Sequence, residues 1–225
     1  KTLKKSEFEF FNTFFQDYYI YLRDNPNTLI NKFYGMYSFD TNNENKTTYF
    51  IIMESLFYSN LNIDEIYDLK GSRKGRLASD KDKQRKIVVF KDLDWIKANH
   101  RIHIGSKLAQ LYTHQLYGDL EFLNGHQIMD YSLLVGIANT SEPPNTSLLF
   151  ANLNQPYLFK SHYNGIGLSN KIYLTGIIDI LQKYNSRKKV ENKLRRIMDS
   201  QQKISCAPPT VYSDRMFEFL NEYIF

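Results

Sequence analysis

Hydrophobic and polar positions first follow a helical period. Ser6 with Glu9 three residues later matches a capping box, a signal for a helix N-terminus. Apolar side chains then recur every three or four residues until Asn25-Pro26 ends the pattern: Phe8, Phe11, Phe15, Tyr18 and Leu22. The spacing predicts a helix over 7–24. Rings of this kind can stack on nucleic-acid bases, but their spacing is the one a buried stripe needs, so we expect them in the core.

The next stretches are typical of strands. The runs KFYGMYSF (32–39) and TTYFIIMESLF (47–57) are rich in β-branched and aromatic residues, and the polar DTNNENK lies between them. This pattern predicts a hairpin with a longish loop. The run EIYDLKGSRKGR (65–76) predicts another strand, which leads into a basic turn from Gly71 to Arg76.

The second half of the chain opens with an amphipathic helix that starts at Ser106 and is closed by Asn124-Gly125. Its inward side chains are predicted to be Leu108, Leu111, Tyr112, Leu116, Leu120 and Leu123. Two apolar runs, MDYSLLVGIA and KIYLTGIIDIL, predict buried strands, and each has one acid in an apolar setting. These acids are Asp130 and Asp179.

The remaining segments are a loop and two helices. Residues 139–170, which include the turn-rich ANTSEPPNTS, predict a loop or variable insertion. A basic helix is predicted around 183–198 and a terminal helix around 210–224. The terminal helix should point these side chains inward: Tyr212, Met216, Phe217, Leu220 and Tyr223.

Composition indicates a folded globular chain. Its 225 residues suffice for one large domain or two tightly joined lobes, and 42% are hydrophobic with only 10 Gly and 6 Pro. No apolar run approaches the roughly 20 residues of a bilayer span. The single Cys206 and the absence of a signal-peptide core predict a reducing compartment, cytoplasm or nucleus. Because the chain starts with Lys1 rather than Met, we expect a fragment or a processed chain.

The net charge of +5 is concentrated in one segment. Residues 183–203 hold eight basic and two acidic side chains, 8 − 2 = +6, so the rest of the chain sums to −1. Such a run is often a solvated helix face. It also fits an anionic partner: a membrane surface, a nucleic acid or a phosphate-bearing substrate.

Few patterns in the chain point to specific chemistry. Only His100 and His103 lie close together, without other ligands at metal-binding spacing, and GIGLSN is a poor match to a dinucleotide-binding loop. The two strand-associated acids and the Lys-rich glycine turn fit phosphoryl transfer better. One acid would orient a hydroxyl, the other would hold Mg²⁺, and cations would neutralise phosphate charge. A buried acid satisfied by backbone amides would give the same sequence pattern.

Five segments in order resemble the signature segments of the phosphatidylinositol phosphate kinase family, and together they span most of the chain. They are YDLKGSRKGRLAS (67–79), FKDLDW (90–95), IMDYSLLVGI (128–137), GIIDILQKYNSRKKVE (176–191) and APPTVYSDRMFEF (207–219). The resemblance implies a two-lobed α+β kinase-like fold, with an antiparallel sheet in each lobe and packed helices. It also implies ATP and Mg²⁺ as cofactors.

The resemblance assigns roles residue by residue. Asp130 would be the catalytic aspartate and Asp179 the metal-binding acid. Lys1 would bind ATP, with Glu7 or Glu9 placed to pair with it. Met53, Glu54 and Leu56 would lie in the hinge beside adenine. Lys70, with Gly71, would belong to the phosphate-proximal strand and turn and complete the catalytic set.

The basic segment would be the activation loop that selects the lipid. Its substrate- or membrane-contacting residues would be Arg187, Lys188, Lys189, Glu191, Lys193, Arg195 and Arg196. Family members that act on phosphatidylinositol 4-phosphate resemble KKLE, whereas those that act on the 5-phosphate carry Ala in place of that Glu. This chain has KKVE, with Glu191. The family's Gly-containing nucleotide-covering loop lies upstream of the lysine, and nothing precedes Lys1 here.

We therefore expect an N-terminal lobe over 1–57 and a C-terminal lobe over 58–225. The larger lobe would hold the catalytic segment 128–137, the variable loop 139–170, the metal-binding strand 172–181 and the activation loop 183–207. The expected function is phosphorylation of the 5-hydroxyl of phosphatidylinositol 4-phosphate to give the 4,5-bisphosphate. It would take place at the cytoplasmic face of an anionic membrane such as the plasma membrane, by a protein that could form homodimers.

Three other functions stay open. A 4-kinase acting on phosphatidylinositol 5-phosphate is disfavoured by Glu191. A catalytically inactive phosphoinositide-binding scaffold would fit a chain without the nucleotide-covering loop. Nucleic-acid binding comes last, because the aromatic side chains do not interleave with the basic run.

Overall fold

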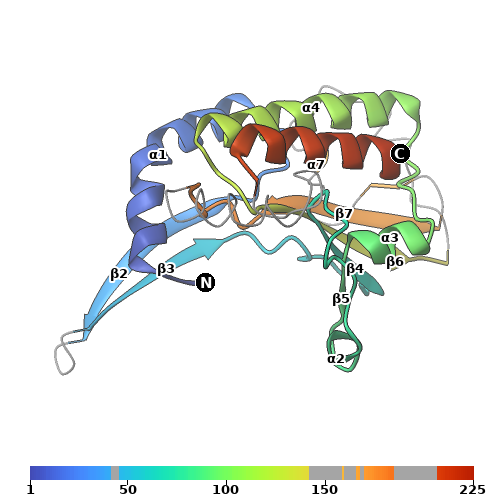
Figure 1. Ribbon diagram of the computed structural model, residues 1–225, viewed down its shortest axis with the longest axis horizontal. Helices are drawn as coiled ribbons and strands as arrows, with labels where there is room; N and C mark the ends of the chain where they lie inside the picture. Colours follow the sequence, from blue (N-terminus) through green and yellow to red (C-terminus); the bar gives the residue numbers. More distant parts are fainter. Residues whose placement is uncertain (42–45, 142–158, 160–165, 168–169, 185–206) are drawn as a thin grey trace.

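The structure is a computed structural model, which describes residues 1–41, 46–141, 159, 166–167, 170–184 and 207–225. Three long helices lie together on one side of the strands (Figure 1). They are α1 (Lys5–Asp24), α4 (Ser106–Gly125) and α7 (Pro209–Tyr223). No helix in this part of the chain is long and apolar enough to cross a membrane. The predicted α+β fold class is confirmed.

A three-stranded antiparallel sheet forms the first region. Its strands β1 (Thr2–Leu3), β2 (Phe33–Thr41) and β3 (Lys46–Met53) have the order β1-β3-β2. The predicted hairpin is therefore confirmed, and Tyr37 lies opposite Phe50 across it with the two rings stacked.

Helix α1 begins earlier, and buries a different face, than the sequence predicted. Glu7 accepts a hydrogen bond from the backbone N–H of Lys4 at 2.7 Å, so the cap lies at Lys4 and the predicted capping box was wrong. Phe15 is 53% exposed, not buried. The buried residues are Phe10, Phe11, Phe14 and Tyr18. Because aromatic residues occupy both faces of this helix, packing against the sheet decides which ones are buried, and spacing alone could not.

A four-stranded sheet forms the second region. Strands β4 (Glu65–Leu69), β5 (Val89–Phe90), β6 (Ser132–Asn139) and β7 (Lys171–Ile178) have the order β5-β4-β6-β7. Strand β5 runs parallel to β4, whereas the other neighbours are antiparallel. The prediction of an antiparallel sheet was therefore wrong at this edge.

Two short helices, α2 (Asp80–Lys83) and α3 (Asp92–Lys97), had not been predicted. Helix α2 is a single turn capped by Ser79, whose hydroxyl oxygen accepts a hydrogen bond from the Asp82 N–H at 3.2 Å. Helix α3 buries Trp95 completely, and the indole N–H donates to the carbonyl of Tyr223 near the C-terminus. Each contains too few residues to show a helical period.

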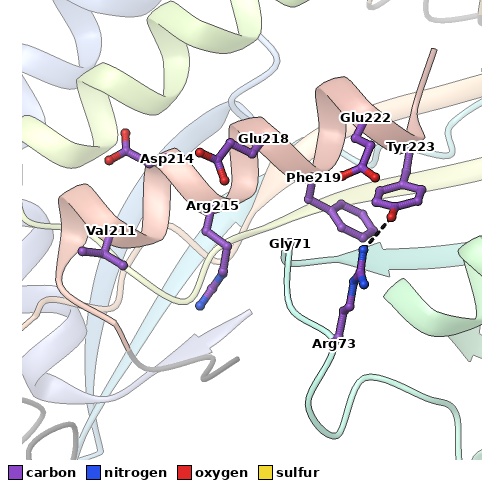
Figure 2. Close-up of a pocket in the computed structure, with 9 residues that line it drawn as sticks. All are labelled: Gly71, Arg73, Val211, Asp214, Arg215, Glu218, Phe219, Glu222 and Tyr223. Carbon is purple, nitrogen blue, oxygen red and sulfur yellow. Dashed lines mark hydrogen bonds between the residues drawn. The ribbon is translucent and has the colours of Figure 1, made fainter. Parts of the chain in front are cut away.

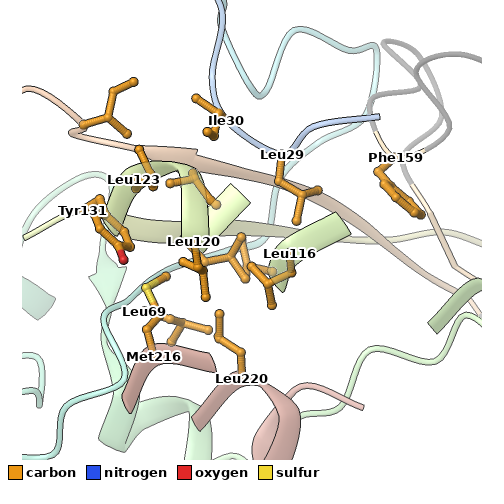
Figure 3. Packing of buried hydrophobic residues seen from close by; sticks show 14 of the residues in the cluster. Leu29, Ile30, Leu69, Leu116, Leu120, Leu123, Tyr131, Phe159, Met216 and Leu220 are labelled. Atoms are coloured by element: carbon orange, nitrogen blue, oxygen red, sulfur yellow. The ribbon is translucent and has the colours of Figure 1, made fainter. Parts of the chain in front are cut away.

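Helices α4 and α7 pack against each other and supply much of the core, where they meet residues that are distant in sequence (Figure 3). The predicted inward residues of α4 are buried except Leu111, which is 38% exposed. Gly125 is the last residue of α4, and the left-handed backbone comes only at Gln127, with φ 57°. In α7, Arg215 and Phe219 are buried where Phe217 and Tyr223 had been predicted.

A buried carboxylate ties α4 to the segment before β2. Asp119 is fully buried and accepts hydrogen bonds from four donors: Thr28 Oγ1 (2.6 Å), the N–H of Leu29 (2.7 Å), Tyr21 Oη (2.9 Å) and Gln115 Nε2 (3.0 Å). Burial raises the pKa of Asp119 to about 6, although these donors oppose the shift. This acid therefore has a structural role.

Some predictions fall outside the described residues. These are most of the loop 139–170, and the basic helix around 183–198 beyond residue 184. The lobe boundary near residue 57 remains a prediction, although each sheet takes all its strands from one side of it.

Candidate active site

The two acids singled out from the sequence lie at the same end of neighbouring strands. Asp130 comes two residues before Ser132, the first residue of β6, and Asp179 directly follows Ile178, the last residue of β7. Ser132 and Ile178 are paired in the antiparallel ladder. The segments beyond the sheet also pair, because the N–H of Met129 donates to the carbonyl of Gln182 at 3.0 Å.

Both acids have an unusual backbone conformation. Asp130 has φ 66° and Asp179 has φ 62°, in the left-handed region. Aspartate tolerates this region better than most residues, and such conformations cluster at functional sites. The conformation turns each chain sharply at the sheet edge, and the side chains stay 40% and 46% exposed.

Asp130 is bound by Lys70, which directly follows the last residue of β4. The Lys70 ammonium donates to the Asp130 backbone carbonyl at 2.6 Å and to its carboxylate at 2.9 Å. The β4–β6 ladder brings the two residues together, since Leu69 lies opposite Leu133. A cation beside the acid is the arrangement that transfer of a charged group needs.

Asp179 is bound by Lys1. The Lys1 ammonium lies 2.5 Å from the Asp179 carboxylate, and the pairing of β1 with β3 holds the start of the chain in place. The expected pairing of Lys1 with Glu7 or Glu9 is not formed between these described residues. Glu7 caps α1 at Lys4, and Glu9 lies 3.7 Å from Lys5 in an exposed ion pair.

A buried ionic network holds the backbone around Lys70. Asp92 is fully buried and accepts hydrogen bonds from the N–H groups of Lys70 (2.9 Å) and Ser72 (3.2 Å). Its second oxygen lies 2.7 Å from Arg76 Nε, and Arg76 also binds Asp68 at 2.5 Å. Burial opposes the charge of Arg76, but these two carboxylates outweigh burial and raise its pKa above the ordinary value.

The same network reaches the Asp130 segment. Ser132 Oγ donates to Asp68 Oδ2 at 3.0 Å, so Asp68 links the strand that carries Lys70 to the strand that Asp130 precedes. The sequence analysis did not identify Asp68, Arg76 or Asp92. Their signal was available, because Asp68 and Asp92 are acids in apolar surroundings just as Asp130 is.

The predicted hinge residues lie between the two sheets. The N–H of Glu54 donates to the carbonyl of Lys32 at 2.8 Å, and the Glu54 carbonyl accepts from Asn31 Nδ2 at 3.1 Å. Both backbone groups of Glu54 are therefore engaged within the chain. Leu56 lies against Gly176 of β7, where a Cβ atom would come within 2.5 Å of the Leu56 side chain.

Met53 closes β3 opposite Phe33. The predicted lipid- and membrane-contacting residues, from Arg187 to Arg196, lie outside the described residues. Nor does the described part of the chain contain a group of three or more His, Cys, Asp or Glu side chains that could hold a metal ion by itself.

Comparison with known proteins agrees with this geometry. The family model described as phosphatidylinositol-4-phosphate 5-kinase matches residues 1–157 and 150–223. The chain is 30% identical to a chicken phosphatidylinositol 4-phosphate 5-kinase type-1 beta over 100% of its own length and 48% of that protein's. It is 29% identical to a fission-yeast phosphatidylinositol 4-phosphate 5-kinase over 100% of its length and 38% of the relative's.

A mouse phosphatidylinositol 5-phosphate 4-kinase type-2 gamma is also 29% identical, over 86% of this chain and 56% of the relative. The chain therefore belongs to the phosphatidylinositol phosphate kinase family, as its motifs indicated. It spans between 38% and 48% of the length of three of the relatives that it matches over its whole length.

Proposed function

We propose that this chain is the catalytic part of an ATP-dependent lipid kinase that phosphorylates the 5-hydroxyl of phosphatidylinositol 4-phosphate. One observation carries the proposal. In a member of this family, two lysine-paired carboxylates, Asp130 and Asp179, lie at the same edge of the β6–β7 ladder. Phosphoryl transfer needs this combination of one acid for the hydroxyl, one for the metal, and cations for the phosphates.

The residues would divide the work by their surroundings. The Asp130 carboxylate would accept the proton of the inositol hydroxyl as that oxygen forms its bond to the γ-phosphorus of ATP and the bond from this phosphorus to the bridging oxygen breaks, releasing ADP. Lys70, already on Asp130, would orient this carboxylate and neutralise negative charge beside it. Lys1 would contact the phosphates from the Asp179 side.

The donor set fits Mg²⁺. This ion prefers carboxylate oxygens and in kinases is commonly bound by one or two carboxylates together with substrate phosphates. Asp179 supplies a half-exposed carboxylate, with one oxygen beside Lys1. When bound, Mg²⁺ would neutralise phosphate charge.

The choice of the 4-phosphate lipid rests on Glu191 in KKVE. A carboxylate in so basic a segment subtracts from membrane attraction. We therefore infer that it orients the inositol ring through charge-assisted hydrogen bonds. The alternative is a helical ion pair with Arg195, which would not affect specificity. Relatives named for each of the two activities have similar identity, so Glu191 is the discriminating residue.

Vesicle assays with radiolabelled ATP test the function. The intact protein that contains this chain should phosphorylate vesicles holding phosphatidylinositol 4-phosphate faster than vesicles holding the 5-phosphate lipid. Glu191→Ala should shift the kcat/KM ratio towards the 5-phosphate lipid by about tenfold, or about 1.4 kcal/mol. An unchanged ratio would remove the argument for a 5-kinase. No transfer to either lipid would overturn the proposal.

Membrane docking is proposed for residues 183–203, with the protein acting at the cytoplasmic face. At about 1 kcal/mol per cation, their balance of +6 sets an upper limit of roughly 6 kcal/mol on the electrostatic attraction to an anionic surface. Sedimentation with anionic vesicles should show binding that weakens as salt is raised and after Arg187, Lys188 and Lys189 are neutralised. Binding insensitive to both changes would contradict this docking.

A further inference from the structure

Helix α7 touches the turn that follows β4 very closely. Gly71 has φ +65°, and a Cβ atom there would lie 2.7 Å from the backbone Cα of Met216. On the same side of the helix, Arg215 Nη2 donates to the carbonyl of Lys70 at 3.3 Å (Figure 2). The backbone of Lys70 is thus held at both ends, by Asp92 at its N–H and by Arg215 at its carbonyl.

The same helix also holds the residue after Asp130. Tyr212 Oη donates a hydrogen bond to the backbone carbonyl of Tyr131. The two rings pack edge to face at 4.8 Å, and the Arg215 guanidinium lies 4.8 Å from the Tyr212 ring. Tyr212 and Arg215 are three residues apart, so they project from one face of α7.

Packing alone does not fix this contact. A cavity of about 470 Å³ opens beside the turn, and its lining includes Gly71, Arg73, Arg215, Phe219 and Tyr223 (Figure 2). Side chains on that side have room to move, so the position of Lys70 depends on the hydrogen bonds to its backbone. Tyr212 is fully buried and Arg215 is 8% exposed, which protects both bonds from competition by water.

We propose that Tyr212 and Arg215 are positioning residues that set the geometry of the Lys70–Asp130 pair from α7. Neither would touch substrate. Each holds one backbone carbonyl, of Lys70 or of Tyr131, and so keeps the ammonium and the carboxylate at their hydrogen-bonding distance. The inference rests on the proposed function, because it gives this pair its part in phosphoryl transfer.

Tyr212→Phe tests it with the smallest change, since the variant removes one oxygen and keeps the ring. Tyr112→Phe is the matched control. Tyr112 is also fully buried, and its hydroxyl donates to Thr175 Oγ1 at 3.1 Å between α4 and β7. Both variants should lose similar stability. Misplacement by 1 Å can cost about 10²-fold in rate, so Tyr212→Phe should lower kcat by about tenfold or more and leave KM for ATP within about twofold. Tyr112→Phe should leave kcat within about twofold of the parent.

Arg215→Met provides a second variant, with Glu218→Gln on the exposed side of α7 as its control. Arg215→Met should lower kcat in the same way, and Glu218→Gln should not. If both Tyr212→Phe and Arg215→Met fold and turn over like their controls, α7 has only a structural role and the inference is wrong.

A readout without turnover separates this inference from the proposed function. The Lys70 side chain is 15% exposed and its ammonium is bound to Asp130 twice, so it should acetylate slowly. Tyr212→Phe should raise the acetylation rate of Lys70 severalfold, and Tyr112→Phe should not. That result in a protein without kinase activity would reject the function and keep the positioning role. Equal Lys70 rates in the parent and in Tyr212→Phe would reject the positioning role.

Discussion

Aspartates of two kinds stand in apolar surroundings in this chain. Asp130 and Asp179 lie at the open edge of the larger sheet, 40% and 46% exposed, on left-handed backbone. Each is bound by a lysine ammonium. Asp92 and Asp119 are fully buried and accept hydrogen bonds from backbone N–H groups and other fixed donors.

The contrast shows how to separate the two roles. A carboxylate saturated by backbone donors cannot release them without unfolding its surroundings, so it supports structure. A carboxylate whose partner is the mobile end of a lysine can exchange that partner for a substrate group or a metal ion. Sequence pattern does not distinguish these cases, because an apolar neighbourhood is common to both.

The largest effect is expected at Asp130. Asp130→Asn keeps the size of the side chain and tolerates φ 66°, but it cannot accept a proton. We expect turnover on phosphatidylinositol 4-phosphate vesicles to fall by about 10²–10⁴-fold. Because the ion pair lies at the surface, the free energy of unfolding should change by less than about 1 kcal/mol. Near-normal turnover in the folded variant would place Asp130 with the structural acids.

Asp92→Asn should have the opposite profile. The substitution removes the charge that faces Arg76 inside the protein and places an NH₂ group near existing donors. We expect a loss of about 3–5 kcal/mol in the free energy of unfolding, measured by denaturant titration. Asp17→Asn, at an exposed acid 3.8 Å from His126, is the control and should cost under about 1 kcal/mol. Equal losses for the two variants would refute the buried-network account.

Asp119 predicts a pH dependence of stability. Its pKa is raised from 3.8 to about 6 in the folded state, so between these values the folded protein holds a proton that the unfolded chain has released. Its contribution is complete below about pH 4 and is lost as pH rises through about 6, by up to about 3 kcal/mol. Asp119→Asn lowers overall stability but should remove this component from the slope. Parallel slopes for parent and variant from pH 4 to 7 would contradict the assignment.

A smaller effect is expected at Asp179. Asp179→Asn should weaken Mg²⁺-dependent ATP binding by about 10–100-fold, as loss of a metal-site group commonly does. Binding measured by calorimetry with excess EDTA should be similar in variant and parent. A variant that binds Mg²⁺ and ATP as tightly as the parent would move the metal site elsewhere.

These cases also show what the sequence could predict. The hairpin, the long helices and the strands beside Asp130 and Asp179 were predictable because each repeats a clear period or apolar run. The buried face of α1 was not, because aromatic residues at Phe10, Phe14 and Phe15 satisfy more than one face. The Lys1–Asp179 contact joins residues 178 positions apart and depends on how the two sheets meet.

The network around Arg76 was missed for a related reason. Its members come from β4, the following turn and α3, and α3 is too short to produce a period. Family motifs contained Asp68 and Asp92, but only the structure shows that both bind one guanidinium.

A double-substitution cycle on Lys70 and Asp130 tests most directly whether the exposed pair acts as one catalytic unit. Turnover would be measured on phosphatidylinositol 4-phosphate vesicles for Lys70→Met, Asp130→Asn and the variant that combines them, at saturating ATP. Groups that act as a unit show strongly non-additive losses. The account predicts that the combined variant loses little more activity than Asp130→Asn alone. A combined loss equal to the product of the two separate losses would show that Lys70 and Asp130 act independently, and would contradict the account.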